Sequence, residues 1–201
     1  MELVEYNSVR SHLRAGDVIA FGGKGFFSSV IKVATNHPCS HVGIVFTTVP
    51  SPKSGEQLNL IIESTSLDGG KAGVQVSRLS ERITNYNGNV WWLPLSDNTR
   101  AKLDEDKFFD FLIKQKGKAY DLPQAIGSAE DLVICNKEDF SKLFCSELVI
   151  AALEKGGVLE DVNASEYTPG DVCMENLYAF YSQFTGKITS LPDFNKGGVV
   201  A

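Results

Sequence analysis

The chain has 201 residues, of which 43% are hydrophobic and 22% are charged, so it is long and apolar enough to fold around a core of its own. Its formal net charge of -6 argues against a broad nucleic-acid-binding face, which would need a surplus of Lys and Arg. We therefore expect a single domain over 1–201 and no nucleic-acid partner.

Hydropathy and the N-terminal residues bear on localisation. No apolar run approaches the roughly 20 residues that span a bilayer. Residues 1–15 mix acidic, basic and polar side chains and lack the apolar segment of a secretory signal. These features predict a cytoplasmic protein without a transmembrane segment. In that compartment reduced thiols are expected for the four cysteines, Cys39, Cys135, Cys145 and Cys173.

The first half of the chain is predicted to consist of short strands separated by turns. Apolar or alternating runs bounded by Gly, Pro and Ser predict strands at 17–21, 41–47, 58–65, 74–78 and 89–95, with a turn at 68–73. A short helix is predicted over 27–35, capped by Ser28 or Ser29. Pro38 biases the preceding residue toward extended geometry, so this helix should end near Asn36.

The second half is predicted to be more helical. An apolar stripe that includes Leu103, Phe108 and Phe111 predicts a helix over 99–115, and a second helix is predicted over 144–155. The segment 127–140 is interpreted as an inserted loop and 187–201 as a loose tail. Strands grouped first and helices after them indicate an α+β fold, with a small antiparallel β-sheet packed against helices.

Cys145 lies in the first turn of the helix predicted over 144–155. Unpaired N–H groups and the positive end of the helix dipole stabilise a thiolate at such a position, and the same groups could donate to an oxyanion. Leu148, Val149 and Ala152 lie on the same helix face, however. Taken alone, Cys145 could therefore be a nucleophile or a small buried side chain.

His41 and Glu63 are predicted to lie close together in a β-hairpin. Alternation along the strand puts His41, Gly43 and Val45 on one face, and Gly43 leaves a notch where a neighbouring helix could approach. Antiparallel pairing about a loop centred near Pro52 places His41 opposite residues 63–65. A carboxylate there can accept one imidazole N–H while the other ring nitrogen serves a thiol.

Five segments together resemble a known family. They are GDVI at 16–19, SHVGIV at 40–45, LIIEST at 60–65, FCSELV at 144–149 and TPGD at 168–171. In this order they resemble the circularly permuted, papain-like branch of the NlpC hydrolase superfamily, the YiiX-like group. Lecithin–retinol acyltransferase-like enzymes are more distant relatives of that group. The resemblance extends over most of the chain, and the pair SHVGI and FCSEL carries most of its specificity.

The resemblance implies a circularly permuted papain-like (NlpC-type) fold and a set of site residues. Cys145 would be the nucleophile, His41 the general base and Glu63 the residue that orients His41. Family members also tend to place a tyrosine near the thiol. Tyr120 and Tyr167 could supply it, and Tyr167 is favoured because it adjoins the TPGD segment. The substrate-binding candidates are Tyr167, Tyr120 and Ser40, the last of which precedes His41 in the matched segment.

The function predicted on this basis is cysteine-dependent hydrolysis of an amide bond. The substrate would be a peptide, including cell-wall-type peptides, and an acyl-thioester would form on Cys145. Two alternatives remain open at this point. The first is a lipid acyl hydrolase or acyltransferase, and the second is a noncatalytic binding module on the same fold. The oligomeric state is not predicted.

A metal site is the competing interpretation of the residues around His41. His37, Cys39 and His41 alternate and could share one strand face, with Glu63 as a fourth ligand. Pro38 interrupts a regular strand there, and a metal would leave the position of Cys145 unexplained. We therefore expect no metal and no cofactor.

Overall fold

The computed structural model describes residues 3–52, 54–65, 72–120 and 142–197. The fold is α+β, as expected, and is built around an antiparallel sheet of six strands in the order β4-β3-β2-β1-β5-β8. The strands are β1 (Val18–Gly23), β2 (His41–Pro50), β3 (Gln57–Thr65), β4 (Gly73–Arg78), β5 (Gly88–Leu93) and β8 (Ser182–Thr185). A short parallel pair, β6 (Ala119–Tyr120) and β7 (Lys142–Leu143), lies outside this sheet.

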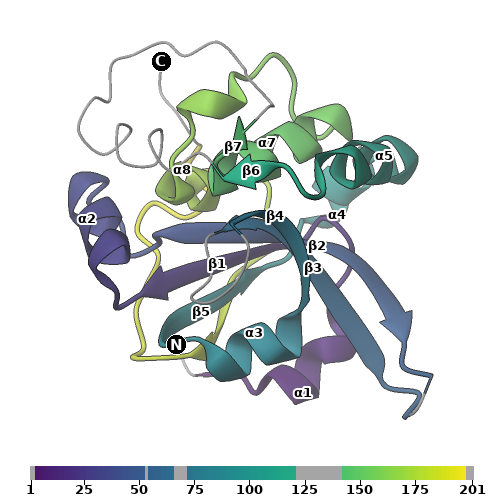
Figure 1. Cartoon of the computed structure of the whole chain (residues 1–201), viewed down its shortest axis with the longest axis horizontal. Coiled ribbons are helices and arrows are strands. Elements are labelled where there is room, and N and C mark those ends of the chain that lie inside the picture. Colours follow the sequence, from purple (N-terminus) through teal and green to yellow (C-terminus); the bar gives the residue numbers. More distant parts are fainter. Residues whose placement is uncertain (1–2, 53, 66–71, 121–141, 198–201) are drawn as a thin grey trace.

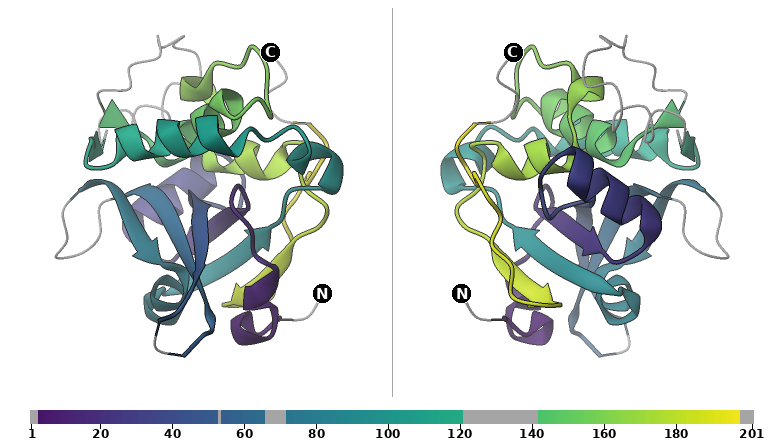
Figure 2. Two further views of the ribbon diagram at one scale, coloured as in Figure 1. Left: turned by 90° about the vertical axis from the view of Figure 1, so that its right-hand side faces the viewer. Right: turned by 90° about the vertical axis from the view of Figure 1, so that its left-hand side faces the viewer.

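Helices cover both faces of the sheet. In Figures 1 and 2, α5 and α7 lie on one side and α1 and α3 on the other. The helices are α1 (Tyr6–Val9), α2 (Phe26–Ala34), α3 (Leu79–Asn85), α4 (Asp97–Arg100), α5 (Glu105–Gln115), α7 (Cys145–Lys155) and α8 (Pro169–Met174), with 3-10 turns at Arg10–His12 and Ala164–Glu166. Within the described ranges, none of the helices combines the length and the apolar character needed to cross a membrane.

Two apolar clusters pack on the two faces of the sheet. The cluster on the α7 side includes Val42 and Ile44, whereas the cluster on the other side includes Val45. The alternation predicted for β2 is therefore confirmed. The pairing of β2 with β3 shifts by one residue between Val45 and Thr47, so this alternation applies to the part of β2 before that point.

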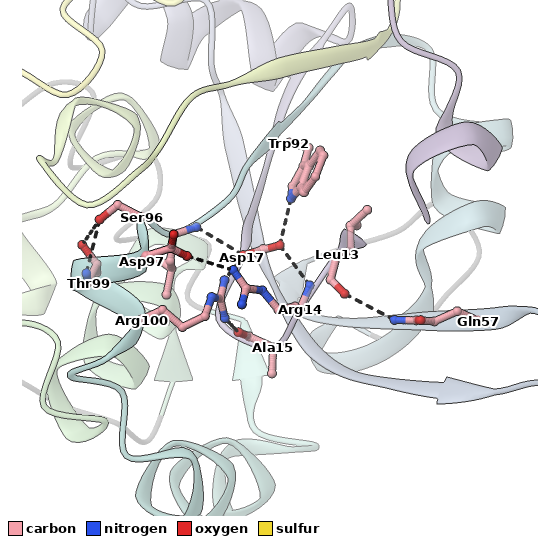
Figure 3. Close-up of polar contacts among 11 residues, drawn as sticks. Leu13, Arg14, Ala15, Asp17, Gln57, Trp92, Ser96, Asp97, Thr99 and Arg100 are labelled. Atoms are coloured by element: carbon pink, nitrogen blue, oxygen red, sulfur yellow. Dashed lines mark hydrogen bonds and ion pairs between the residues drawn. The ribbon is translucent and has the colours of Figure 1, made fainter. Parts of the chain in front are cut away.

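Asp17, directly before β1, is a buried carboxylate that joins three elements (Figure 3). It accepts hydrogen bonds from the N–H of Arg14 at 3.0 Å, the indole N–H of Trp92 at 2.9 Å and the N–H of Leu95 at 3.2 Å, and it pairs with Arg100. The contacts show why the position suits an acid, because a buried charge needs several donors.

Several element boundaries differ from the prediction. The helix predicted over 99–115 is two helices, because the Asp104 side chain accepts from the N–H of Lys107 at 3.1 Å and starts α5. The cap predicted for α2 is wrong, since Gly25 holds the N-cap position and Ser29 donates its hydroxyl back to the Gly25 carbonyl. Helices α3 and α8 and strand β8 were not predicted.

The segments interpreted as a tail and an insertion have different outcomes. Residues 187–197 lack regular secondary structure but are held to β5, where Asn89 donates to the hydroxyl of Thr189 at 3.0 Å and Trp91 donates to its carbonyl at 3.1 Å. A loose tail therefore does not describe them. The predicted inserted loop at 127–140 and most of the turn at 68–73 lie outside the described residues.

Candidate active site

Cys145 is the first residue of α7, as the sequence predicts. It is 1% exposed, and Leu148, Val149 and Ala152 on its face are fully buried in the core. The N–H of Phe144 donates to the carboxylate of Glu147 at 3.3 Å, which fixes the first turn of the helix. Backbone N–H groups at the start of a helix are in general not bonded within its first turn, so the turn that holds Cys145 is a source of N–H donors.

His41 is the first residue of β2. Its Nε2 lies 2.8 Å from Oε2 of Glu63 in β3. The Cys145 side chain is close enough to the ring for its charge and hydrogen bonding to raise the pKa of His41. Because Glu63 occupies Nε2, Nδ1 is the nitrogen that remains for the sulfur. The side chain of His41 is 14% exposed and that of Glu63 is fully buried, so solvent reaches this pair at the imidazole.

Glu63 is fully buried and accepts three charge-assisted hydrogen bonds. One comes from His41, and Arg82 in α3 supplies two, from Nε at 2.6 Å and Nη2 at 2.9 Å. The two Arg82 bonds form a planar fork that fixes the carboxylate plane. Arg82 also lies over the ring of Phe21, with its guanidinium carbon 5.0 Å from the ring centroid. This packing leaves the guanidinium little freedom to turn away from Glu63.

Arg82 is a site residue that the sequence analysis missed. The sequence contains a signal for it in the form of helical spacing. This spacing places one arginine on an apolar helix face formed by Leu79, Arg82, Ile83 and Tyr86. A buried acid such as Glu63 also requires a partner of opposite charge. The helix at 79–85 was not predicted, however, so this spacing could not be assigned to a helix face.

The charges of the site are coupled. Burial disfavours a charged imidazole, but the charge and hydrogen bond of Cys145, together with those of Glu63, outweigh it and raise the pKa of His41 to about 10. Burial would raise the pKa of Glu63, but His41 and Arg82 hold it at about 2. At neutral pH the site therefore holds an imidazolium between an anionic carboxylate and the thiol group.

Removing the thiol should release the proton of His41 at a lower pH. In the Cys145→Ala variant the imidazole loses the interactions with Cys145 that raise its pKa, so we expect the pKa of His41 to fall below the wild-type value. The measurement is an NMR titration of the imidazole resonances, which is tractable because the chain has 3 histidines. Exposed His12 should give the same curve in both proteins. An unchanged His41 curve would mean that the thiol and the ring are not coupled.

Gly43 provides space for Glu63. A Cβ atom at this position would lie 3.2 Å from the Cβ of Glu63 and 3.3 Å from the carbonyl of Ile62. The predicted notch therefore exists, but the neighbouring strand occupies it rather than a helix. The hairpin register explains this, because Ile44 pairs with Ile62 and the adjacent residues continue that pairing.

The three substrate-binding candidates have different surroundings. The hydroxyl of Ser40 is buried and bonds to backbone groups of β1, donating to the Phe21 carbonyl and accepting from Gly23, both at 3.3 Å. Tyr167 donates its hydroxyl to Glu175 at 2.8 Å. Tyr120 lies in β6, and its side chain is outside the described part of the structure. Substrate contact by any of the three stays a prediction.

The metal alternative combined residues that the structure separates into two groups. His41 and Glu63 bond to each other, as described above. His37 and Cys39 lie beside Cys173 of α8, with their ligand atoms within 4.8 Å of one another. The ligand set drawn from the sequence is therefore wrong, because His41 faces other partners.

The chain is similar to known proteins in structure but not in sequence. No family model matches the chain, and no curated protein matches it by sequence. Among solved structures, it is similar to the metalloprotein yiiX from Escherichia coli O157:H7, at 19% sequence identity and a TM-score of 0.47. The aligned region covers 71% of this chain and 66% of that one, just under two thirds of its length.

Proposed function

We propose that this protein is a cysteine hydrolase that cleaves amide bonds in peptides, including cell-wall-type peptides, through an acyl-thioester on Cys145. The observation that carries the proposal is a continuous series of contacts from Cys145 through His41 and Glu63 to Arg82. A cysteine at a helix start, bonded to an imidazole that a carboxylate orients, is the arrangement that nucleophilic acyl transfer requires.

The raised pKa of His41 makes its imidazole a strong proton acceptor. In this mechanism the thiol passes its proton to the imidazole, so Cys145 attacks the carbonyl carbon as a thiolate. The carbon–sulfur bond forms, the carbonyl π electrons move onto oxygen, and first-turn N–H groups of α7 stabilise that oxyanion. Collapse of the intermediate breaks the carbon–nitrogen bond, and His41 gives its proton to the leaving amine.

Deacylation reverses the direction of proton transfer. His41, now neutral, takes a proton from a water molecule, whose oxygen attacks the thioester carbon. The carbon–sulfur bond then breaks, which releases a carboxylic acid and restores the thiolate and the imidazolium. Glu63 and Arg82 keep their charges throughout and hold the ring in the orientation that serves both steps.

The chain order of the reactive residues agrees with the permuted papain-like branch. His41 and Glu63 come before Cys145, whereas ordinary papain-like enzymes place the cysteine first. The location of the cysteine at a helix start and the histidine at the start of a sheet strand fits the fold that this resemblance implies. The relation to that superfamily is part of the proposal.

Reactivity of Cys145 tests the proposal directly. Limiting iodoacetamide should alkylate Cys145 faster than Cys39, Cys135 and Cys173, and His41→Ala should remove the difference because the thiolate loses its cationic partner. Incubation with a small library of peptides and activated esters should give a covalent acyl adduct on Cys145, detected by intact mass and peptide mapping. Equal alkylation rates, with no adduct from any substrate, would refute a nucleophilic role.

A further inference from the structure

Three metal-ligating side chains gather outside the proposed active site. His37 and Cys39 lie in the turn that leads into β2, and Cys173 lies in α8, far away in the sequence. One ligand atom from each lies within 4.8 Å of the other two. Cys39 and Cys173 are fully buried and His37 is 4% exposed, so the cluster is inside the protein.

The polar atoms of this cluster are only weakly satisfied by the protein. Among the described residues, no group meets hydrogen-bonding geometry with the buried His37 Nε2, although the Pro192 backbone is near enough to the ring to act on its pKa; Nδ1 accepts the N–H of Cys39 at 3.1 Å. The thiol of Cys39 donates to the His41 carbonyl at 3.3 Å and that of Cys173 to the Pro169 carbonyl at 3.4 Å. Thiols are weak hydrogen-bond donors, so these bonds add little to the stability of the fold. Hydrogen bonding therefore does not explain why an imidazole and two sulfurs lie together here.

The close packing around His37 shows that the ring is fixed in place. A Cβ atom at Gly170, in the same helix as Cys173, would lie 2.9 Å from both Cβ and Cγ of His37. The absence of a side chain at Gly170 therefore allows α8 to approach the ring closely enough to bring Cys173 beside it. Ligands held in this way need little rearrangement to bind an ion.

We propose that His37, Cys39 and Cys173 form a binding site for a thiophilic metal ion, of which Zn²⁺ and Cu⁺ are the two biological candidates. Thiolate and imidazole ligands favour these ions over Mg²⁺ or Ca²⁺, which take oxygen ligands. Binding replaces the two thiol protons by two metal–sulfur bonds and releases the protons to solvent. This site departs from the sequence-based expectation that the protein binds no metal.

The location gives the ion a structural role that does not depend on the proposed hydrolase activity. It would join α8 to the residues that immediately precede β2, and Cys39 lies two positions before His41. An ion that binds the folded chain alone stabilises it by mass action. We therefore expect Zn²⁺ to raise the melting temperature of the whole chain and to limit movement at the start of β2.

Metal stoichiometry with matched cysteine variants tests the site. The full chain, reduced and stripped with a chelator, is loaded with Zn²⁺ or Co²⁺ and then dialysed. We expect one ion per chain, and a thiolate-to-cobalt charge-transfer band with Co²⁺. Cys39→Ser and Cys173→Ser should abolish both signals, whereas Cys145→Ser should keep them. Metal that is lost in Cys145→Ser but kept in the other two variants would place the ion at the proposed active site and overturn the assignment.

A measurement on the unmodified chain covers the case in which a variant does not fold. Pulsed alkylation followed by peptide mapping compares the cysteines with and without Zn²⁺. Zn²⁺ should slow modification of Cys39 and Cys173 by the same factor and leave Cys135 unchanged. A parallel loading with Cu⁺ under anaerobic conditions shows which ion is held more tightly. If neither ion protects the two thiols, they are a buried pair and not a metal site, and the hydrolase proposal is unaffected.

Discussion

Replacing Cys145 by alanine is expected to lower kcat/KM by at least roughly a thousandfold against every substrate that the wild-type chain cleaves. The loss follows from the mechanism, because without the sulfur there is no acyl-thioester, and removing a nucleophile costs an enzyme most of its rate enhancement. Steady-state kinetics on the most reactive substrate from the adduct screen measures the effect. The fold should survive, since the substitution removes a single sulfur atom from a buried position and adds no bulk.

Two further variants make this result interpretable. Cys135→Ala, which removes a cysteine outside the described residues, should retain wild-type turnover. Cys145→Ser should be nearly as inactive as Cys145→Ala, because a hydroxyl does not give up its proton to the imidazole as a thiol does. Activity that persists in Cys145→Ala, with circular dichroism matching the wild type, would exclude the proposed chemistry.

The Arg82→Ala variant should be both less stable and less active. Without Arg82, the fully buried Glu63 keeps His41 as its one described ionic partner and loses two of its three charge-assisted bonds. Breaking a buried ion pair from one side costs about 3–5 kcal/mol, which urea denaturation should reveal as a lower free energy of unfolding. We also expect kcat to fall by about a hundredfold with little change in KM, because the imidazole loses its fixed orientation.

Arg78 provides a matched control for this experiment. It lies directly before α3, and its ion pair with Glu81 is exposed, with side-chain exposures of 58% and 63%. Arg78→Ala should therefore change stability by less than about 1 kcal/mol and leave turnover unchanged. Arg82→Lys should recover part of kcat, since an ammonium restores the charge but not the planar fork. Equal effects at both positions would mean that Arg82 does not position the site.

Local rules in the sequence were sufficient for one part of the site. The hairpin between β2 and β3 could be predicted because an antiparallel register fixes which residues face each other, and this placed Glu63 beside His41. The start of α7 could be predicted from the apolar spacing after Cys145. Both predictions depend on residues that are near each other in the sequence or that face each other across one pair of strands.

Contacts between separate elements could not be predicted in the same way. Arg82 reaches Glu63 because α3 packs against the sheet, and Cys173 reaches Cys39 because α8 packs beside the start of β2. No spacing rule connects these positions, and the metal alternative accordingly included His41 and Glu63 and omitted Cys173. Asp104 likewise divided a predicted helix, because its side chain caps α5 in competition with a continuous helix.

The sequence by itself therefore determined the α+β class, the alternating faces of β2, the proximity of His41 to Glu63 and the helix-start position of Cys145. Those properties follow from backbone periodicity, which each segment carries along its own length. The tertiary structure decided how the segments meet: that the thiol reaches the imidazole, that Arg82 neutralises Glu63, and that His37, Cys39 and Cys173 converge. Such contacts depend on how the helices pack over the sheet, and packing is set by the shape and burial of many side chains at once.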